Sequence, residues 1–219
     1  MAKRSVRLSR DAIVDCATAL ADAEGLEAVT IRRLAQENGV TPMAMYWHFN
    51  DKDSLLDGLA EHLIASVKLP EPGDGTWDEQ LRAILVAFLD AIRPHPALAG
   101  LALRRILVAE PGLRLAERVL DLLRQAGFSP EQAAEVGTFL LCAVITLVVG
   151  DPMAAKAAAG GDVAADMRHK QAMLQALEPG RYPNLIAAAP ALVSCRGQDD
   201  YFTVNIDLLV QGVRGSRRN

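Results

Sequence analysis

The side chains best placed to do chemistry are four consecutive rings, Tyr46-Trp47-His48-Phe49, in a chain of 219 residues. A helix that buries one face needs apolar residues three or four positions apart, so four bulky neighbours cannot all face one core. Tyr46 and His48 can each donate a hydrogen bond, and a phosphate oxygen would accept it. We therefore expect Tyr46 and His48 to face a partner, and Trp47 and Phe49 to pack against neighbouring helices.

Capping signals divide the chain around these rings into short helices. Thr30 can cap a helix that ends at Gly39, and Thr41 followed by Pro42 can start another that runs to about residue 49. A longer helix capped by Ser9 precedes both. Two short helices joined by a turn with glycine are typical of a helix-turn-helix, whose second helix enters the major groove of DNA.

In that arrangement the second helix presents its N-terminal residues to base edges. The hydroxyl of Thr41 can donate to a phosphate or a base, and Pro42 and Met43 can contact a thymine methyl group. Lys52 adds positive charge at the start of the next helix, whose N-terminus itself favours an anion. One arginine of the pair 32–33 should also reach the DNA backbone or groove.

Charge is distributed unevenly along the chain. The net charge of −4 argues against a general nucleic-acid coat, but a phosphate responds to local charge. Four basic residues precede the first acid, and they are Lys3, Arg4, Arg7 and Arg10. This basic end can be a disordered, solubilising tail or an arm that reaches the minor groove or the backbone of DNA, and the sequence leaves both open.

Several classes of protein do not fit the sequence. The three cysteines are odd in number and widely spaced, which fits a reducing cytoplasm and no disulfide framework. No apolar run reaches the roughly 18 residues of a membrane span, and no signal peptide is apparent. Catalytic arrangements of Ser/His/Asp, Cys/His or paired carboxylates are missing at recognisable spacing, as is a GxxxxGK[ST] loop. We predict a cytoplasmic protein that is not an enzyme, without cofactor, metal site or membrane partner.

Helical periodicity dominates the whole chain, and strand alternation is almost absent. Beyond the linker 69–75, rich in Pro, Gly and acid, the expected helices run from 76 to about 93 and over 97–108, 112–126, 130–149, 162–178 and 199–214. We predict an all-α protein with two domains. Residues 1–68 form a three-helix DNA-binding domain with the helix-turn-helix at about 31–50, and residues 76–215 form a helical bundle for ligand binding and dimerisation.

The apolar stripe from Phe139 to Val149 is most simply core, and two further roles, a dimer interface and a ligand cavity, compete for its faces. The last helix repeats apolar residues at helical spacing, which suits a dimer interface. These residues are Phe202, Ile206, Leu209 and Val213. A ligand cavity is the other use, and its candidate lining is Phe88, Leu103, Phe139, Cys142 and Thr146. Such a cavity would have few polar anchors, which favours a hydrophobic or aromatic ligand.

The stretch GLEAVTIRRLAQENGVTPMAMYWHFNDKDSLLDGLAEHL resembles the DNA-binding domain of the TetR family of bacterial transcription regulators over roughly residues 8–65. It combines G-x-x-x-x-T-x-R-x-L-A, G-V, Y-W-H-F and K-x-x-L-L at fixed spacing. The second half is similar, more loosely, to the ligand-binding domain of the tetracycline-repressor branch through LLRQAGFSPEQA and DDYFTVNIDLLVQGV. The resemblance implies a homodimeric repressor, on the nucleoid when bound, that leaves a palindromic operator when a small effector enters. An activator or a ligand-independent regulator of the same fold is the alternative.

The resemblance also implies residue roles. Family positions that contact phosphate or the groove correspond here to Thr30, Arg32, Tyr46, His48 and Lys52. The base-reading positions correspond to Thr41, Pro42 and Met43. Tetracycline repressors carry an amide side chain where this chain has Pro42, so its operator should differ from theirs. Between His95 and His169 there is no histidine, and the helix that would supply a glutamate reads ITLVVGDP, so a magnesium-chelated tetracycline is not the expected effector.

Overall fold

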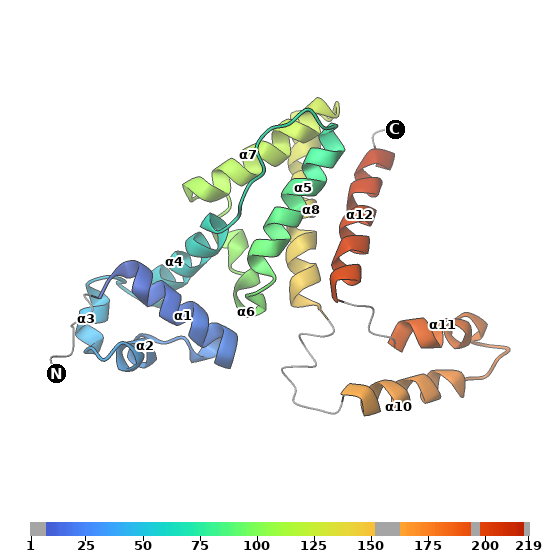
Figure 1. Cartoon of the computed structure of the whole chain (residues 1–219), viewed down its shortest axis with the longest axis horizontal. Coiled ribbons are helices and arrows are strands. Elements are labelled where there is room, and N and C mark those ends of the chain that lie inside the picture. Colours follow the sequence, from blue (N-terminus) through green and yellow to red (C-terminus); the bar gives the residue numbers. More distant parts are fainter. Residues whose placement is uncertain (1–7, 152–162, 194–197, 217–219) are drawn as a thin grey trace. The chain divides into compact units, whose positions relative to one another are not determined.

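The computed structural model describes residues 8–151, 163–193 and 198–216 (Figure 1). Over these ranges the chain is helical and contains no strand, which confirms the all-α prediction. The described residues form two compact units. One combines the chain before residue 150 with residues from 206 onward, and the other is the chain between them. Most of the basic N-terminal end lies outside the described residues, as does Cys195.

Four helices form the N-terminal part of the first unit, each begins at a capping residue, and for the first three helices that residue is the one the sequence predicts. Their bounds are Arg10–Glu24 (α1), Ile31–Glu37 (α2), Pro42–Tyr46 (α3) and Lys52–Ala65 (α4). A side-chain oxygen accepts from the backbone amide three residues further on at Ser9, Thr30, Thr41 and Asp51. A short 3₁₀ turn, η1 (Leu26–Ala28), links α1 to α2. Fully buried side chains join the four helices, among them Ile13, Leu34, Met45, Leu55 and Leu59.

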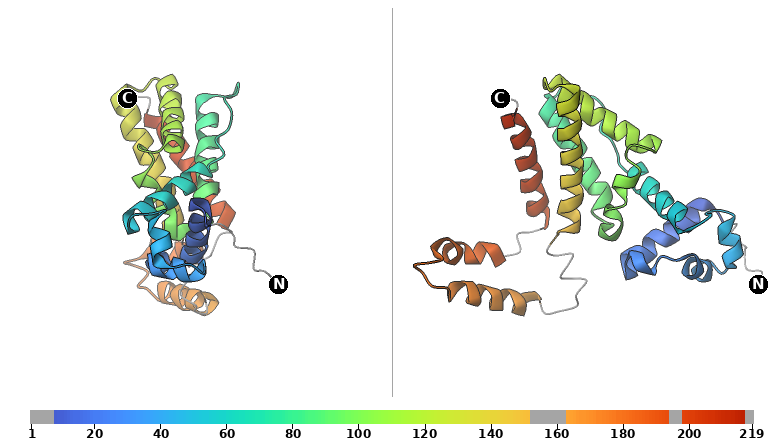
Figure 2. Two further views of the ribbon diagram at one scale, coloured as in Figure 1. Left: turned by 90° about the vertical axis from the view of Figure 1, so that its left-hand side faces the viewer. Right: turned by 180° about the vertical axis from the view of Figure 1, so that it is seen from behind.

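Three long helices form the predicted bundle in the rest of this unit. They are α5 (Trp77–Ile92), α7 (Glu110–Gln125) and α8 (Pro130–Val149), and they pack against one another. Two further views show α5 and α8 running alongside each other (Figure 2). Within the described ranges α8 is the single helix with the length and hydropathy of a membrane span. Its fully buried Leu140 and Val144 and its contacts with α5 and α7 are those of a bundle core.

The prediction of a continuous helix over residues 97–108 is wrong. This segment forms only α6 (Pro96–Ala99) and a 3₁₀ turn, η2 (Ala102–Arg104), and then continues in turns. The amides of Arg105 and Val108 donate to carbonyls three residues back, the pattern of a 3₁₀ turn and not of an α-helix. The chain folds back here against Gly112, where an added Cβ would lie 2.4 Å from the carbonyl oxygen of Ile106.

The remaining helices are α10 (Val163–Gln175), α11 (Pro183–Val193) and α12 (Gln198–Ser216). In the second unit α10 and α11 pack side by side. The sequence reasoning missed α11 because Pro190 interrupts its pattern, although Pro183 occupies the favoured first position. The C-terminal part of α12 belongs to the first unit, where Arg82 binds Asp207 and Arg214 binds the buried Asp78 of α5.

Candidate nucleic-acid interface and effector cavity

One face of α3 presents large side chains to solvent. Met43 is 69% exposed and Tyr46 is 48% exposed, and Thr41 and Pro42 at the start of the helix are exposed as well. The opposite face is anchored, because Met45 is fully buried. A short helix that is firmly packed on one side and carries polar and apolar groups on the other is suited to reading a surface such as a DNA groove.

The prediction that Trp47 packs against a neighbouring helix is wrong, because Trp47 is 85% exposed. Helix α3 ends at Tyr46, and the amides of His48 and Phe49 both donate to the carbonyl of Met45. This tight turn directs the Trp47 side chain outward, next to Tyr46 in the chain. The indole of Trp47 therefore adds to the exposed surface next to α3 and not to the packed core of the domain.

Phe49 is buried, as the sequence predicts, with 1% of its surface exposed. The guanidinium of Arg10 lies 4.4 Å from the centre of its ring and also donates to the carbonyl of His48 at 3.3 Å. On another side is Gly58 of α4, where an added Cβ would lie 2.8 Å from the Phe49 ring. Arg10, Phe49 and Gly58 together fix the position at which the chain leaves α3.

The arginines of α2 have different surroundings. Arg33 pairs with Glu24 and Glu37, each at 2.9 Å, whereas Arg32 is exposed. Of the two, Arg32 is therefore the one available to an anion. The Thr30 hydroxyl accepts from the amide of Arg33 at 3.1 Å and keeps its own proton for donation.

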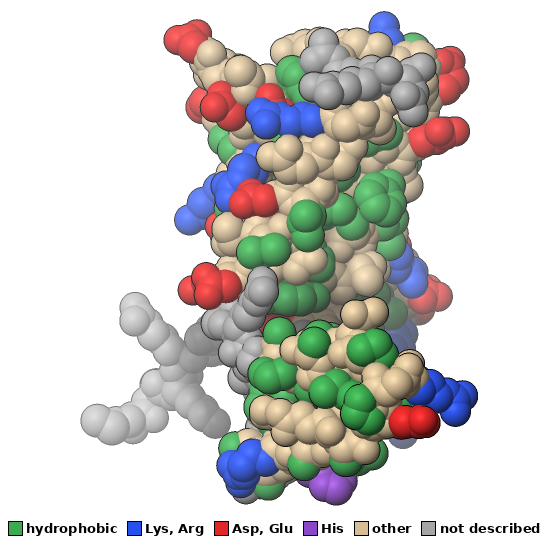
Figure 3. Space-filling model, turned by 90° about the vertical axis from the view of Figure 1, so that its right-hand side faces the viewer, with side chains coloured by type: hydrophobic (Ala, Val, Ile, Leu, Met, Phe, Trp, Pro, Cys, Tyr) green, Lys and Arg blue, Asp and Glu red, His purple; other side chains and the backbone are tan. Residues whose placement is uncertain are grey.

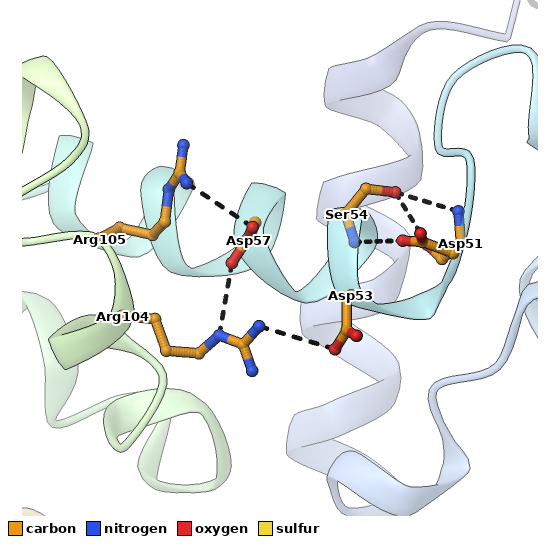
Figure 4. Close-up of polar contacts among 6 residues, drawn as sticks. All are labelled: Asp51, Asp53, Ser54, Asp57, Arg104 and Arg105. Carbon is orange, nitrogen blue, oxygen red and sulfur yellow. Dashed lines mark hydrogen bonds and ion pairs between the residues drawn. The ribbon is translucent and has the colours of Figure 1, made fainter.

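The first turn of α4 is rigidly capped, as the close-up shows (Figure 4). A carboxylate oxygen of Asp51 accepts from the amide of Ser54 at 2.7 Å, and the Ser54 hydroxyl accepts from the amide of Asp51 at 3.2 Å. The backbone amide of Ser54 lowers the pKa of the Asp51 carboxyl. Lys52, which follows, is exposed and is only loosely paired, with Nζ 4.0 Å from a carboxylate oxygen of Glu27.

Two arginines, Arg104 at the end of η2 and Arg105 directly after it, reach across to α4 (Figure 4). Nη2 of Arg104 lies 3.6 Å from Asp53 and its Nε lies 3.3 Å from Asp57. Arg105 places Nη1 3.6 Å from Asp57 and Nη2 3.9 Å from Glu61. The sequence reasoning missed this cluster. Its signal is the tandem arginine within LALRRILV, an apolar segment in which two adjacent charges need partners.

A cavity of about 240 Å³ lies between the η2 turn, α7 and α8. Its lining is almost entirely aliphatic and consists of Leu103, Ile106, Leu107, Ala116, Val119, Leu120, Ala134, Gly137, Thr138 and Leu141. The hydroxyl of Thr138 is the one polar side-chain group in this lining. No His, Cys, Asp or Glu cluster suited to a metal ion occurs in the part of the chain that the structure describes.

The predicted cavity residues and this lining share only Leu103. Phe88 is fully buried in the bundle core, and Phe139 is 61% exposed on another face of α8. Cys142 and Thr146 lie further along α8, where the Thr146 hydroxyl donates to the Cys142 carbonyl. The two sets differ because α8 is apolar on more than one face, so hydropathy alone does not tell which face borders this cavity.

Two family models match the chain. One, described as "Bacterial regulatory proteins, tetR family", matches residues 13–59. The other, described as "Tetracyclin repressor-like, C-terminal domain", matches residues 69–216, more than half of the chain. The chain belongs to the TetR family. Its relatives within the TetR family are named as transcriptional regulators and repressors, not as enzymes.

Individual TetR relatives align over different lengths. Tetracycline repressor protein class C of Escherichia coli is 28% identical and aligns over 96% of this chain and 93% of its own. An HTH-type transcriptional regulator of Saccharopolyspora erythraea is 29% identical over 65% of this chain, which spans 59% of that relative. The crystal structure of the TetR family protein ActR of Streptomyces coelicolor in complex with actinorhodin superposes with a TM-score of 0.82, at 29% identity, covering 96% and 97% of the two chains.

For this TetR protein the predicted dimer residues need correction. Phe202, Ile206 and Val213 are buried within the protomer at 5% exposure or less, and Leu209 is half-buried. In the part of α12 that belongs to the first unit, the exposed large apolar side chain is Leu208, at 64%. Hydrophobic side chains are visible on the surface that includes α12 (Figure 3). Helical spacing alone selected the inner face of α12 because both of its faces carry apolar residues.

Proposed function

We propose that this protein is a homodimeric repressor that binds a palindromic operator through α3 and leaves it when a small, largely apolar effector enters the cavity. The observation that carries the proposal is the exposed face of α3, held in place by the buried Met45 and Phe49. The large aromatic side chains of Tyr46 and Trp47 are exposed to solvent, although such side chains are usually buried. They lie at the end of the helix that a helix-turn-helix places in the major groove.

The proposed DNA contacts fall into two groups. Phosphate contacts come from Thr30, Arg32, Tyr46, His48 and Lys52, and we add Trp47 to this surface because of its exposure. Base readout comes from Thr41, Pro42 and Met43. Thr41 and Met43 are exposed at the N-terminal end of α3, which is the end that meets base edges.

The effector follows from the cavity lining. Aliphatic walls and a single hydroxyl, from Thr138, favour an uncharged molecule with one hydrogen-bonding group facing that threonine. A charged effector would lose its hydration in this cavity without gaining an oppositely charged partner, and burial of an unpaired charge carries a large free-energy cost. The bound organic molecule in the ActR structure supports a small-molecule effector for this chain too.

We infer that dimerisation uses the exposed apolar residues of α8 and α12, namely Phe139, Val149 and Leu208. In a cytoplasmic dimer bound to DNA, the two α3 helices would lie about 34–36 Å apart, one turn of B-DNA. The effector then acts as a population shift, since it releases DNA only by binding better to the conformation with the wrong spacing.

The test is selection of bound sequences from a random double-stranded DNA library by the full-length protein, followed by titration of the enriched sequence. Tyr46→Ala should weaken binding by about 1 kcal/mol per half-site, the net contribution of one hydrogen bond, while the dimer persists in light scattering. Tyr182→Ala, in the second unit, is the matched control and should bind as the wild type does. Failure of the wild type to enrich any sequence would refute the proposed function.

A further inference from the structure

One short segment, residues 103–107, faces both the cavity and α4. Leu103, Ile106 and Leu107 line the cavity, while the two residues between them, Arg104 and Arg105, pair with acidic residues of α4. A molecule that displaces this part of the cavity wall therefore also moves Arg104 and Arg105, because they are neighbours of the wall residues in the chain, and so changes their ion pairs with α4.

The acids in question lie beside a proposed phosphate contact. Residues 51–61 of the chain hold four carboxylates, Asp51, Asp53, Asp57 and Glu61, and one cation, Lys52, a formal charge of −3. The two arginines, which pair with three of these acids, reduce it to −1. Asp53 is 80% exposed and directly follows Lys52, so it lies within a Debye length, about 8–10 Å, of a phosphate that Lys52 binds.

We propose that Arg104 and Arg105 form an electrostatic mask: in the DNA-binding state they offset most of the negative charge of α4, and loss of their ion pairs exposes carboxylates that repel the DNA backbone. The inference rests on the proposed function and specifies its regulation. Release of DNA then has a charge component that acts even where the spacing of the two α3 helices is unchanged.

The contacts of residues 103–107 are weak enough for the ion pairs of Arg104 and Arg105 to break when the segment moves. The ion pairs are longer than close hydrogen bonds, at 3.3–3.9 Å, and partly exposed, so each contributes modestly. Within the described ranges the Nε of Arg105 is buried without a hydrogen-bond partner, which makes the present position less than optimal for that side chain. On the other side the segment rests against Gly112, so it cannot yield in that direction.

A mask and a mechanical tether make opposite predictions for one double variant. If Arg104 only holds α4 in place, Arg104→Ala should weaken operator binding and Asp53→Asn should not restore it, because the substitution also removes a tether. If Arg104 masks charge, Asp53→Asn restores binding, because the exposed carboxylate next to Lys52 is gone and Asp57 keeps its pairing with Arg105. The amide of asparagine matches the carboxylate in size and lies on an exposed side chain, so folding is preserved.

The experiment uses the full-length protein and the operator that the wild type selects, at low salt and again at 0.3 M salt. We expect Arg104→Ala to bind about three- to tenfold more weakly at low salt, with a smaller loss at high salt, where charges are screened. Arg104→Ala/Asp53→Asn should return to within about twofold of the wild type. Arg114→Ala, which removes the same charge from an exposed position on α7, is the control and should change binding less than twofold.

Two results would overturn the mask. One is wild-type affinity of Arg104→Ala, and the other is an affinity of Arg104→Ala/Asp53→Asn as low as that of Arg104→Ala. Either result leaves the proposed function intact, since both require that the wild type binds its operator. A wild type that selects no DNA sequence is a failure of the proposed function instead. Thermal unfolding of each variant separates a loss of binding from a loss of folding.

Discussion

The proposed DNA-binding surface and the proposed effector cavity are built in contrasting ways. The proposed DNA contacts all come from one run, residues 30–52, in which capping side chains set each helix start within a few residues of the contact it positions. The cavity walls come from three separate segments, 103–107, 116–120 and 134–141. A surface made by one run is determined by local chemistry, whereas a cavity made by three depends on how the helices pack. The first therefore tolerates changes in the bundle that would abolish the second.

The largest expected effect lies in the bundle. Ile206→Asp buries a carboxylate at a fully buried position on the inner face of α12, and should lower the free energy of unfolding by about 4 kcal/mol or more. Leu208→Asp, two residues away and 64% exposed, should leave unfolding almost unchanged and dissociate the dimer. Thermal unfolding and light scattering on both variants test the pair. A folded, monomeric Ile206→Asp protein would restore the original interface assignment.

The next effect sharpens the contrast within a single run of residues. Phe49→Ala removes a buried ring between Arg10 and Gly58, and should cost about 3–5 kcal/mol of stability. Trp47→Ala should cost less than about 0.5 kcal/mol, because the ring is 85% exposed, but should weaken operator binding. Chemical denaturation measures the first quantity and DNA titration the second. Equal destabilisation by the two substitutions would mean that Trp47 is packed in solution.

A smaller effect concerns the cavity wall. At Gly112 an added Cβ would lie 2.4 Å from the carbonyl oxygen of Ile106 and 2.8 Å from that of Arg105, so the backbone itself must shift. Gly112→Ala should destabilise the protein by about 1–3 kcal/mol. It should also alter the response to effector more than operator affinity. Gly100→Ala, with open space around the new methyl group, is the matched control. Unfolding that is the same for both variants would argue against the close packing of this wall.

The smallest effect is on the salt dependence of binding. Lys52→Ala should reduce the slope of log affinity against log salt concentration by about one for each half-site, because one phosphate contact is lost. Lys170→Ala on α10 removes the same charge from the second unit and should leave the slope unchanged. Measuring the slopes by fluorescence anisotropy decides the matter, and an unchanged slope for Lys52→Ala would remove Lys52 from the phosphate contacts.

The sequence predicted what local chemistry decides. Hydroxyl caps at Thr30 and Thr41, with Pro42 after the second, located α2 and α3. It did not predict that α3 ends at Tyr46 and turns Trp47 outward, because the end of a short helix depends on the tertiary packing of Phe49. It also did not distinguish the faces of α8 and α12, since both faces of each helix carry apolar residues. The pairing of Arg104 and Arg105 with α4 joins residues about 50 positions apart in the chain, a separation that helical periodicity does not reach.

The measurement that tests the central claim most directly is a comparison of the DNA sequences selected by the wild type and by Met43→Arg. If α3 reads the major groove with its first residues, arginine at this exposed position should introduce a preference for guanine at one position of each half-site, through its fork of donors to O6 and N7. The half-site spacing of one helical turn should be retained. Selection of the same sequence by both proteins would contradict base readout by α3.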